Sequence, residues 1–409
     1  MIESTRPRVA IIGAGPAGLI AADVLSAAGL AVTVFDQMRS PGRKFLLAGR
    51  GGLNITHSEP LNEFLNRYGP DRQFLEPAIR AFDADALREW SLGLGEATFV
   101  GSSGRVFPAS FRATPLLRAL LLRLQTNGVE MRPQHRWTGW DTDDALSFVH
   151  PSLNDISFAA DATILALGGA SWPGTGATGA WTSILTTSGV GIVPLRPANC
   201  GFAVNWSPHF ASRFAGIPLK NIALHYDDTT VRGEAMITSD GIEGGAIYAL
   251  ARALRTGIES GKGSRFFVDL QPDRDIDAVA EKLSTRRPKE SSSNWLRRSL
   301  SLSRVGIALV REHTRNHIPD DMEQVALLVK RLPVDVTATQ PIVRAISSAG
   351  GISKHEVDSN FMLHKRAGVY AVGEMLDWEA PTGGYLLQAT FSTAVAAARA
   401  VIERHARST

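Results

Sequence analysis

The chain has 409 residues, of which 44% are hydrophobic and 20% are charged, and its formal net charge is +3. This length predicts two or three domains, and the balanced charge argues against a surface built mainly for nucleic acid. The single cysteine, Cys200, excludes intrachain disulfides, cysteine-rich zinc sites and a CxxC redox pair. We therefore expect a disulfide-free cytoplasmic protein with no metal site. The start of the chain lacks the pattern of a signal peptide, and no apolar run of about 18 residues predicts a membrane span.

The first predicted element is an apolar strand at 8–12. The run GAGPAG at 13–18 and a helix that ends at Gly29 follow it, and a second strand at 31–36 ends on Asp36. This is a βαβ unit that contains GxGxxG and carries an acidic residue about 20 positions after the glycines, the context that a dinucleotide site requires. The first glycine allows the tight turn, the second admits a pyrophosphate, and the third lets helix and strand pack closely. Asp36 is expected to bind the adenosine ribose and to repel a 2′-phosphate. The motif alone does not decide whether the site binds NAD, binds FAD or is a tight turn without a ligand.

The stretch PGRKFLLAGRGGLNITHSE at 41–59 is rich in glycine and carries Arg43, Lys44 and Arg50. Such a loop predicts close contact with a flat, anionic cofactor, and the alternative is a solvated surface loop. His57 is expected on the surface rather than in catalysis. Residues 71–127 predict amphipathic helices around one β segment, with structural roles.

A buried strand at 161–167, closed by Gly168, is expected to return the chain to the central sheet. A second GxGxxG follows at 174–179, but six residues separate it from the strand and no strand ending in Asp or Glu comes after it at the right distance. This context favours a glycine-rich loop over a separate NAD(P)H site. The basic segment 284–312 predicts a solvated helical face, with RNA binding as the alternative.

The last part of the chain contains a hydrophobic strand, AGVYAVGE at 367–374, then Thr382-Gly383-Gly384, and then a long alanine-rich helix. Two glycines at the mouth of a helix cost backbone entropy, which predicts a function for an unobstructed helix N-terminus.

Four stretches, 11–22, 41–59, 164–179 and 349–392, give the chain a resemblance to a known group. It resembles the two-dinucleotide-binding-domain flavoproteins, and within them the bacterial FAD-dependent oxidoreductase family that includes aminoacetone oxidase. Residues 48–54, AGRGGLN, depart from the family pattern, which reads Ser-Gly-Gly-Gly-Arg-Cys-Asn. In this chain the arginine stands at Arg50, and Leu53 replaces the cysteine.

The resemblance implies an α/β fold with a discontinuous, Rossmann-like FAD-binding domain at 1–192 and 346–409. It further implies an inserted β-rich domain at 193–272 and an inserted helical subdomain at 273–345. The implied cofactor is FAD, with the start of the last helix under the flavin ring. The residues expected to bind FAD are Gly13, Gly15, Pro16, Ala17, Gly18, Asp36, Gln37, Arg43, Lys44, Asn54, Thr56, Gly168, Gly373, Glu374, Thr382, Gly383, Gly384, Tyr385 and Leu386.

The expected function is an FAD-dependent oxidoreductase that transfers hydride between a small organic substrate and the flavin. Amine or carbon–carbon oxidation with oxygen and reduction of an unsaturated substrate both stay open. A flavin-dependent tRNA-modifying or RNA-binding protein and a non-catalytic FAD-binding protein are the alternatives. The sequence assigns no catalytic acid or base. It predicts a small-molecule substrate, no nucleic-acid or membrane partner, and leaves a homo-oligomer open.

Overall fold

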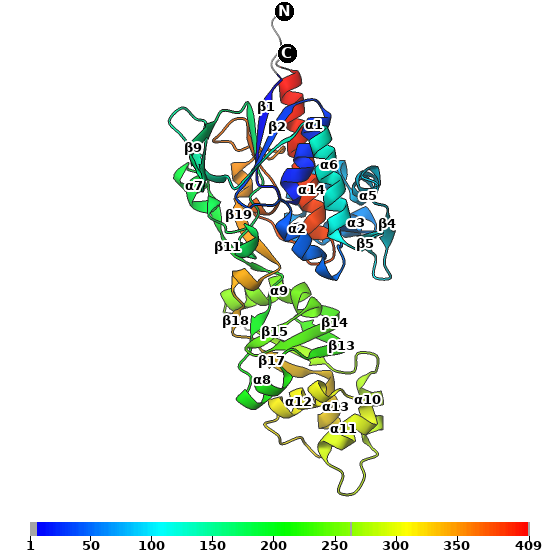
Figure 1. Cartoon of the computed structure of the whole chain (residues 1–409). Helices are drawn as coiled ribbons and strands as arrows, with labels where there is room; N and C mark the ends of the chain where they lie inside the picture. The colour runs from blue at the N-terminus through cyan, green and yellow to red at the C-terminus, as the bar shows by residue number, and fades with distance from the viewer. Residues whose placement is uncertain (1–5, 262–263, 408–409) are drawn as a thin grey trace, which may run out of the picture. The chain divides into compact units, whose positions relative to one another are not determined.

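The structure is a computed structural model that describes residues 6–261 and 264–407. It divides the chain into two compact units, one formed by residues 1–196 and 347–409 and the other by residues 197–346 (Figure 1). The first unit is therefore discontinuous, and the second is inserted into it.

The first unit is built on a five-stranded sheet in which every neighbouring pair is parallel. The strands are, in order across the sheet, β20 (Val369–Ala371), β10 (Ala162–Leu165), β1 (Arg8–Ile12), β2 (Ala31–Asp36) and β6 (Glu130–Pro133). Strand β10 lies within the predicted strand 161–167 and pairs with β1, so the predicted return to the central sheet is confirmed.

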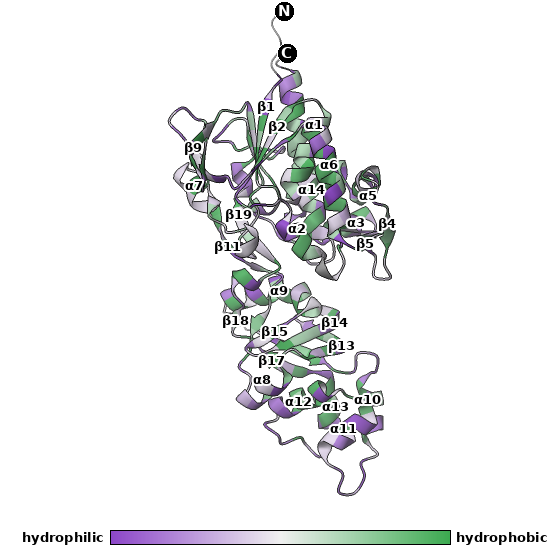
Figure 2. Ribbon diagram, viewed as in Figure 1, coloured by the Kyte–Doolittle hydropathy of each residue, from purple (hydrophilic) through white to green (hydrophobic). Residues whose placement is uncertain are grey.

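Both faces of this sheet are buried, which explains the uninterrupted apolar runs of its strands. Val9 and Ile11 of β1 face one core, which contains α1 (Pro16–Ala27), α6 (Ala113–Thr126) and α14 (Tyr385–Ala406). Ala10 and Ile12 face the opposite core. There a three-stranded sheet of β7 (Arg136–Trp140), β8 (Leu146–His150) and β9 (Leu153–Phe158) supplies the covering side chains. In Figure 2, green hydrophobic residues recur along α1, α6 and α14 beside the sheet.

Shorter elements complete the first unit. They are α2 (Arg43–Ala48), β3 (Thr56–His57), α3 (Leu61–Asn66), α4 (Arg72–Ala81), α5 (Ala84–Gly93), β4 (Thr98–Val100), β5 (Arg105–Pro108), α7 (Trp181–Thr187), β11 (Ile192–Ala198) and β19 (Ser347–Ile352). Strand β3 pairs with β5, and β11 pairs with β19. Helix α2 corrects one expectation, because part of the stretch predicted as a loop is helical from Arg43.

Helix α14 is the one described helix long and apolar enough to cross a membrane by length and composition. Two thirds of its most apolar window is buried inside the structure, where the helix packs along α1. A buried core helix passes the same test, so this feature is weak support for a membrane span.

The second unit contains a seven-stranded sheet. The strand order is β17 (Leu332–Asp335), β16 (Arg265–Asp269), β13 (Pro218–Tyr226), β14 (Thr229–Thr238), β15 (Gly241–Glu243), β12 (Phe202–Ala203) and β18 (Ala338–Thr339). The helices are α8 (Pro208–Phe214), α9 (Gly245–Glu259), α10 (Ile276–Leu283), α11 (Ser292–Leu300), α12 (Arg304–His313) and α13 (Met322–Lys330).

One hydrophobic core joins the strands and helices of this second unit. The sequence predicts two inserted parts, 193–272 and 273–345, but β17 and β18 return to the sheet after the helices. Since the sheet and the helices bury their apolar side chains against each other, the structure groups them as one unit.

Candidate functional site

The glycine turn between β1 and α1 contains three glycines with two different roles. An added Cβ at Gly13 would lie 2.4 Å from the Ala166 carbonyl oxygen, and one at Gly18 would lie 1.9 Å from the Gly13 carbonyl oxygen. These two glycines are therefore required by the turn itself. An added Cβ at Gly15 would meet no atom within 4 Å. Gly15 borders open space at the N-terminus of α1, where backbone N–H groups favour an anion. Pro16 is the first helical residue, and Ala17 is buried behind it.

Asp36, at the end of β2, binds the glycine turn directly. Its carboxylate accepts hydrogen bonds from the backbone N–H groups of Ala14 and Met38, each at 2.7 Å. Burial raises the pKa of Asp36, and the two backbone hydrogen bonds and the charge of Arg43 partly offset that rise. Each oxygen keeps a lone pair for a further donor such as a ribose hydroxyl.

A cavity of about 410 Å³ lies beside Asp36. Its walls are largely apolar and come from the ends of β1, β2 and β6 and from α6. They include Ala14, Val34, Met38, Leu121 and Pro133. An apolar cavity at the carboxyl ends of parallel strands, next to a carboxylate that can accept from a ribose hydroxyl, fits the adenosine end of a dinucleotide.

The second glycine motif lies in a loop between β10 and α7. Gly176 accepts a hydrogen bond on its carbonyl oxygen from the side chain of Gln37, at 2.5 Å. The next strand, β11, pairs with β19 rather than with the parallel sheet. Among the described residues the motif therefore does not open a second βαβ unit, and Gln37 is occupied in holding this loop.

Two predicted cofactor residues from opposite ends of the chain contact each other. The ammonium of Lys44 lies 2.6 Å from a Glu374 carboxylate oxygen and 2.8 Å from the hydroxyl of Ser171. Gly168, with φ +70°, lies close by, because its added Cβ would be 4.0 Å from Glu374 Oε2. The sequence singles out Lys44, Glu374 and Gly168 but misses Ser171, which has no motif of its own.

Gly373 has a packing role. Its φ is +69°, and an added Cβ would lie 3.3 Å from the side chains of Ala17 and Thr390, between α1 and α14. Its backbone N–H donates to the hydroxyl of Thr393. The glycine therefore allows the strand that ends at 371 to pass between two helices.

Two further predicted residues carry side-chain oxygens with no hydrogen-bond partner in the described part of the chain. They are Oδ1 of Asn54 and Oγ1 of Thr56, and both atoms are buried. A buried, unsatisfied polar atom costs free energy unless a ligand or water satisfies it. These two oxygens are therefore suited to hold a bound group.

The N-terminus of α14 lies directly against the segment that carries Thr56. Gly384 caps the helix with φ +101°, and an added Cβ would lie 2.5 Å from the carbonyl carbon and oxygen of Thr56. Gly383 has φ +128°. Gly384 thus serves a close contact between two backbones, whereas an added Cβ at Gly383 would lie 2.9 Å from the ring of Tyr385. Thr382 and Leu386 flank this contact and are half-buried.

The hydroxyl of Tyr385, a residue predicted to bind the cofactor, is directed to Glu59. It donates to Glu59 Oε1 at 2.6 Å, and Arg67 donates to the same carboxylate from Nε at 3.1 Å and from Nη2 at 2.7 Å. Glu59 is the last residue of the glycine-rich stretch 41–59, and the sequence gives no sign of its partners. Arg67 belongs to no recognisable motif. Only the fold brings them to Tyr385.

This carboxylate gives a pH-dependent prediction. Burial raises the pKa of Glu59, but the hydrogen bonds from Arg67 and Tyr385 outweigh it and hold the pKa below its ordinary value of 4.5. The pairing therefore adds stability above pH 4.5 that is lost as the pH falls through the lowered native pKa. We expect the apoprotein to unfold at higher urea concentration than its Glu59→Gln variant at pH 7, with the difference shrinking below pH 4.5. A difference that stays constant down to pH 3 would contradict this pairing.

The site as a whole fits a dinucleotide that carries a second, polar ring system. Gly15 leaves room for phosphate, Asp36 and the cavity suit adenosine, and the unsatisfied oxygens of Asn54 and Thr56 lie on a different segment, next to α14. Within the described residues, no cluster of three or more His, Cys, Asp or Glu side chains could hold a metal ion. The fold and the site define a dinucleotide-binding protein of the Rossmann class.

Comparison with known proteins specifies this class. The model of the HI0933-like protein Rossmann domain matches residues 7–400, so the chain belongs to the HI0933-like family. FAD is the cofactor, and the chain is an FAD-dependent oxidoreductase, as predicted from the resemblance.

Two curated relatives match over nearly their whole length. The chain is 27% identical to the 3-dehydro-bile acid delta(4,6)-reductase of Clostridium scindens, covering 97% of this chain and 99% of the relative. It is 24% identical to the ribosomal RNA dihydrouridine synthase of Escherichia coli, covering 96% and 97%.

Two solved structures share the fold. The 3-ketosteroid delta1-dehydrogenase of Sterolibacterium denitrificans aligns with a TM-score of 0.56 at 10% identity, covering 98% of this chain and 100% of that one. A flavocytochrome c3 fumarate reductase aligns with a TM-score of 0.51 at 14% identity, covering 99% and 78%.

Proposed function

We propose that this protein reduces a carbon–carbon double bond conjugated to a carbonyl group in a small organic substrate. The observation that carries the proposal is the chemistry shared by the two full-length relatives. A 3-dehydro-bile acid delta(4,6)-reductase and a dihydrouridine synthase both add hydrogen to a double bond conjugated with a carbonyl. FAD, when bound, supplies the hydride in such a reduction.

The residues of this chain supply binding and orientation. Gly15 and the N-terminus of α1 would hold the pyrophosphate, Asp36 would hold the ribose, and Asn54 and Thr56 would offer oxygens to the remaining part of FAD. The single cysteine, Cys200, is buried in the second unit, and Leu53 stands where the resembled family has its cysteine. A thiol at that position therefore cannot deliver the proton that the substrate needs.

The proposal is tested in anaerobic stopped-flow experiments with the photoreduced holoenzyme. We expect a 4-en-3-one steroid or another unsaturated ketone to restore the absorbance of oxidised flavin, while the saturated ketone of the same skeleton leaves it reduced. Amine oxidation with oxygen is the opposite direction: small amines would bleach the oxidised holoenzyme. Bleaching by amines, with no reoxidation by any unsaturated carbonyl compound, would overturn the proposal.

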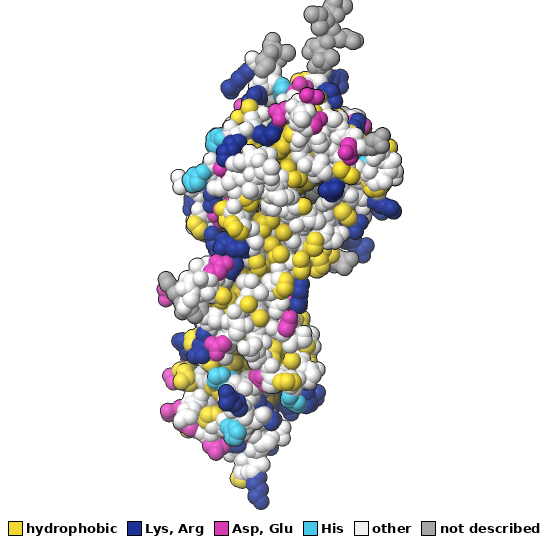
Figure 3. All heavy atoms as spheres, turned by 90° about the vertical axis from the view of Figure 1, so that its left-hand side faces the viewer, with side chains coloured by type: hydrophobic (Ala, Val, Ile, Leu, Met, Phe, Trp, Pro, Cys, Tyr) yellow, Lys and Arg dark blue, Asp and Glu magenta, His cyan; other side chains and the backbone are white. Residues whose placement is uncertain are grey.

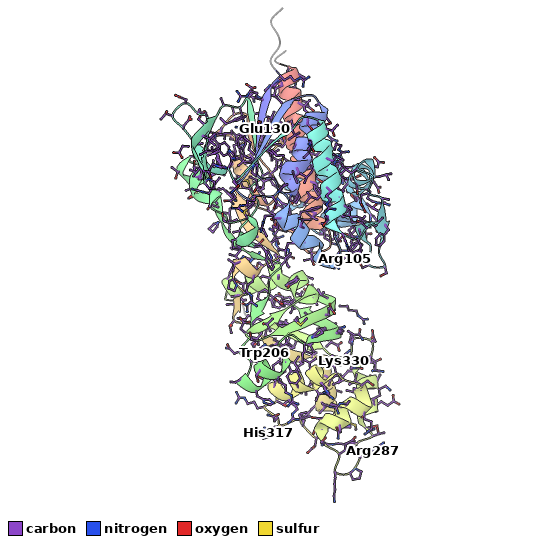
Figure 4. All side chains as sticks on the ribbon, in the orientation of Figure 1. Arg105, Glu130, Trp206, Arg287, His317 and Lys330 are labelled. Atoms are coloured by element: carbon purple, nitrogen blue, oxygen red, sulfur yellow. The ribbon has the colours of Figure 1, made fainter. Side chains whose placement is uncertain are left out.

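A second candidate substrate is uridine in RNA, and one surface feature favours it. Residues 284–316 contain eight cations and two carboxylates. Glu290 pairs with Arg298, but Arg297, Arg304 and Arg315 are exposed and have no ion-pair partner among the described residues. Figure 4 shows Arg287 and His317 projecting from this part of the second unit.

The distribution of charges on the surface, however, argues against RNA as the substrate. On the face drawn in Figure 3, cations and carboxylates are interspersed over the second unit instead of forming a field of one sign. In the same stopped-flow experiment, reoxidation by uridine-containing RNA that weakens steeply with salt would favour RNA over a small molecule. A small-molecule substrate, a cytoplasmic location and the absence of nucleic-acid and membrane partners remain predictions, and a homo-oligomer stays open.

A further inference from the structure

The start of α14 and the segment 54–59 are held together by contacts that converge on Tyr385. Besides its hydrogen bond to Glu59, the tyrosine ring stacks on His57, with ring centroids 5.5 Å apart and an interplanar angle of 20°. Its main-chain carbonyl accepts a hydrogen bond from the hydroxyl of Tyr68 at 2.8 Å. Tyr385 is only 5% exposed. These contacts fasten a residue near the end of the chain to a segment more than 300 positions earlier.

Arg67 completes the group by neutralising Glu59. Two of its guanidinium nitrogens donate to the carboxylate, which is the bidentate geometry that fixes both partners in direction. The Glu59 side chain is 8% exposed, whereas that of Arg67 is 52% exposed. The carboxylate is therefore enclosed by its two donors, and the arginine reaches it from the surface.

The protonation states argue for a mechanical role rather than a proton relay. Burial and the neighbouring Glu59 raise the pKa of Tyr385 well above its ordinary value, while that of Glu59 is lowered. The proton therefore stays on the phenol throughout the neutral range, and the carboxylate stays ionised. Both ring nitrogens of His57 also have hydrogen-bond partners. Nδ1 accepts from the Glu59 backbone N–H, and Nε2 donates to the Ser103 carbonyl oxygen.

The segment held in this way carries the two unsatisfied oxygens of the site. Thr56 follows Asn54 by two residues, and its backbone is the group that an added Cβ at Gly384 would strike. We propose that Tyr385, Glu59 and Arg67 form a positioning latch that holds segment 54–59 against α14 and keeps Asn54 and Thr56 in place to bind FAD. The latch acts on the cofactor and is independent of the substrate.

The first test is the Tyr385→Phe variant, which keeps the ring and removes the hydroxyl. A hydrogen bond to a charged group corresponds to a factor of about ten or more in an equilibrium constant. We expect the dissociation constant for FAD, titrated into apoprotein, to rise about tenfold. We also expect faster amide hydrogen exchange at 54–59. The matched control is Tyr370→Phe, a buried tyrosine on β20 of the same unit, for which neither quantity should change.

A second variant, Arg67→Met, covers the case in which Tyr385→Phe folds poorly, because Arg67 is half exposed. We expect a smaller rise in the FAD dissociation constant. In the double variant we expect the FAD dissociation constant to rise by less than the product of the two single-variant factors, since both residues act on Glu59. FAD affinity and exchange at 54–59 that match the wild type in both single variants would overturn the latch. So would loss of thermal stability with unchanged FAD affinity.

Discussion

A Gly15→Val protein is expected to fold normally and to lose its FAD. Gly15 is extended, with φ −83° and ψ −174°, and no described atom occupies the space that its Cβ would enter. The fold therefore gives no reason for glycine there, apart from a helix-capping cost of about 1 kcal/mol. The pyrophosphate of FAD does provide a reason for glycine, because an inserted side chain would keep the phosphates from the N–H groups of α1. Overpacking of about 1–3 kcal/mol corresponds to a rise of about 5- to 160-fold in the dissociation constant.

The measurement is bound flavin per protein, together with FAD titration of the apoprotein and its thermal unfolding. The matched control is Gly174→Val, in the second glycine motif, where an added Cβ also meets no atom within 4 Å. This control should keep its FAD, since that motif lies outside any βαβ unit of the described chain. Normal FAD affinity in Gly15→Val, or equal loss in both variants, would show that the first turn is not the pyrophosphate site.

A Gly384→Ala substitution is expected to destabilise the apoprotein, even before FAD is considered. Alanine at φ +101° costs about 1–2 kcal/mol. The new Cβ would also lie 2.5 Å from the Thr56 carbonyl, and a strand backbone cannot rotate away as a side chain can. That overpacking adds about 1–3 kcal/mol. We expect the Tm of the apoprotein to fall by roughly 5–15 °C.

The control for this second prediction is Gly29→Ala, at the end of α1. Its φ is also positive, +85°, but an added Cβ meets no atom within 4 Å. It therefore isolates the cost of the backbone conformation from that of the contact. If Gly384→Ala and Gly29→Ala lower the Tm of the apoprotein equally, the close approach of α14 to Thr56 is absent in solution.

The first glycine turn shows how much a local pattern can determine. Strand, turn, helix and Asp36 lie within about 30 residues, and their hydrogen bonds and packing depend on residue types at fixed spacing. The sequence therefore predicted this βαβ unit and the doubtful status of the second glycine motif. FAD required more, because the motif alone leaves the dinucleotide open. The family resemblance over several stretches supplied it.

The tertiary structure decided which side chains meet. The pairing of Lys44 with Glu374 and Ser171, and the enclosure of Glu59 by Arg67 and Tyr385, join segments that lie up to 330 residues apart. No spacing rule covers such pairs, because the sheet order and the path of α14 create them. For the same reason the sequence predicted a function for the double glycine before α14, but it could not predict the contact of Gly384 with the Thr56 backbone. A glycine in the sequence indicates that a side chain would not fit at that position. Only the folded structure shows which neighbouring atoms occupy the space.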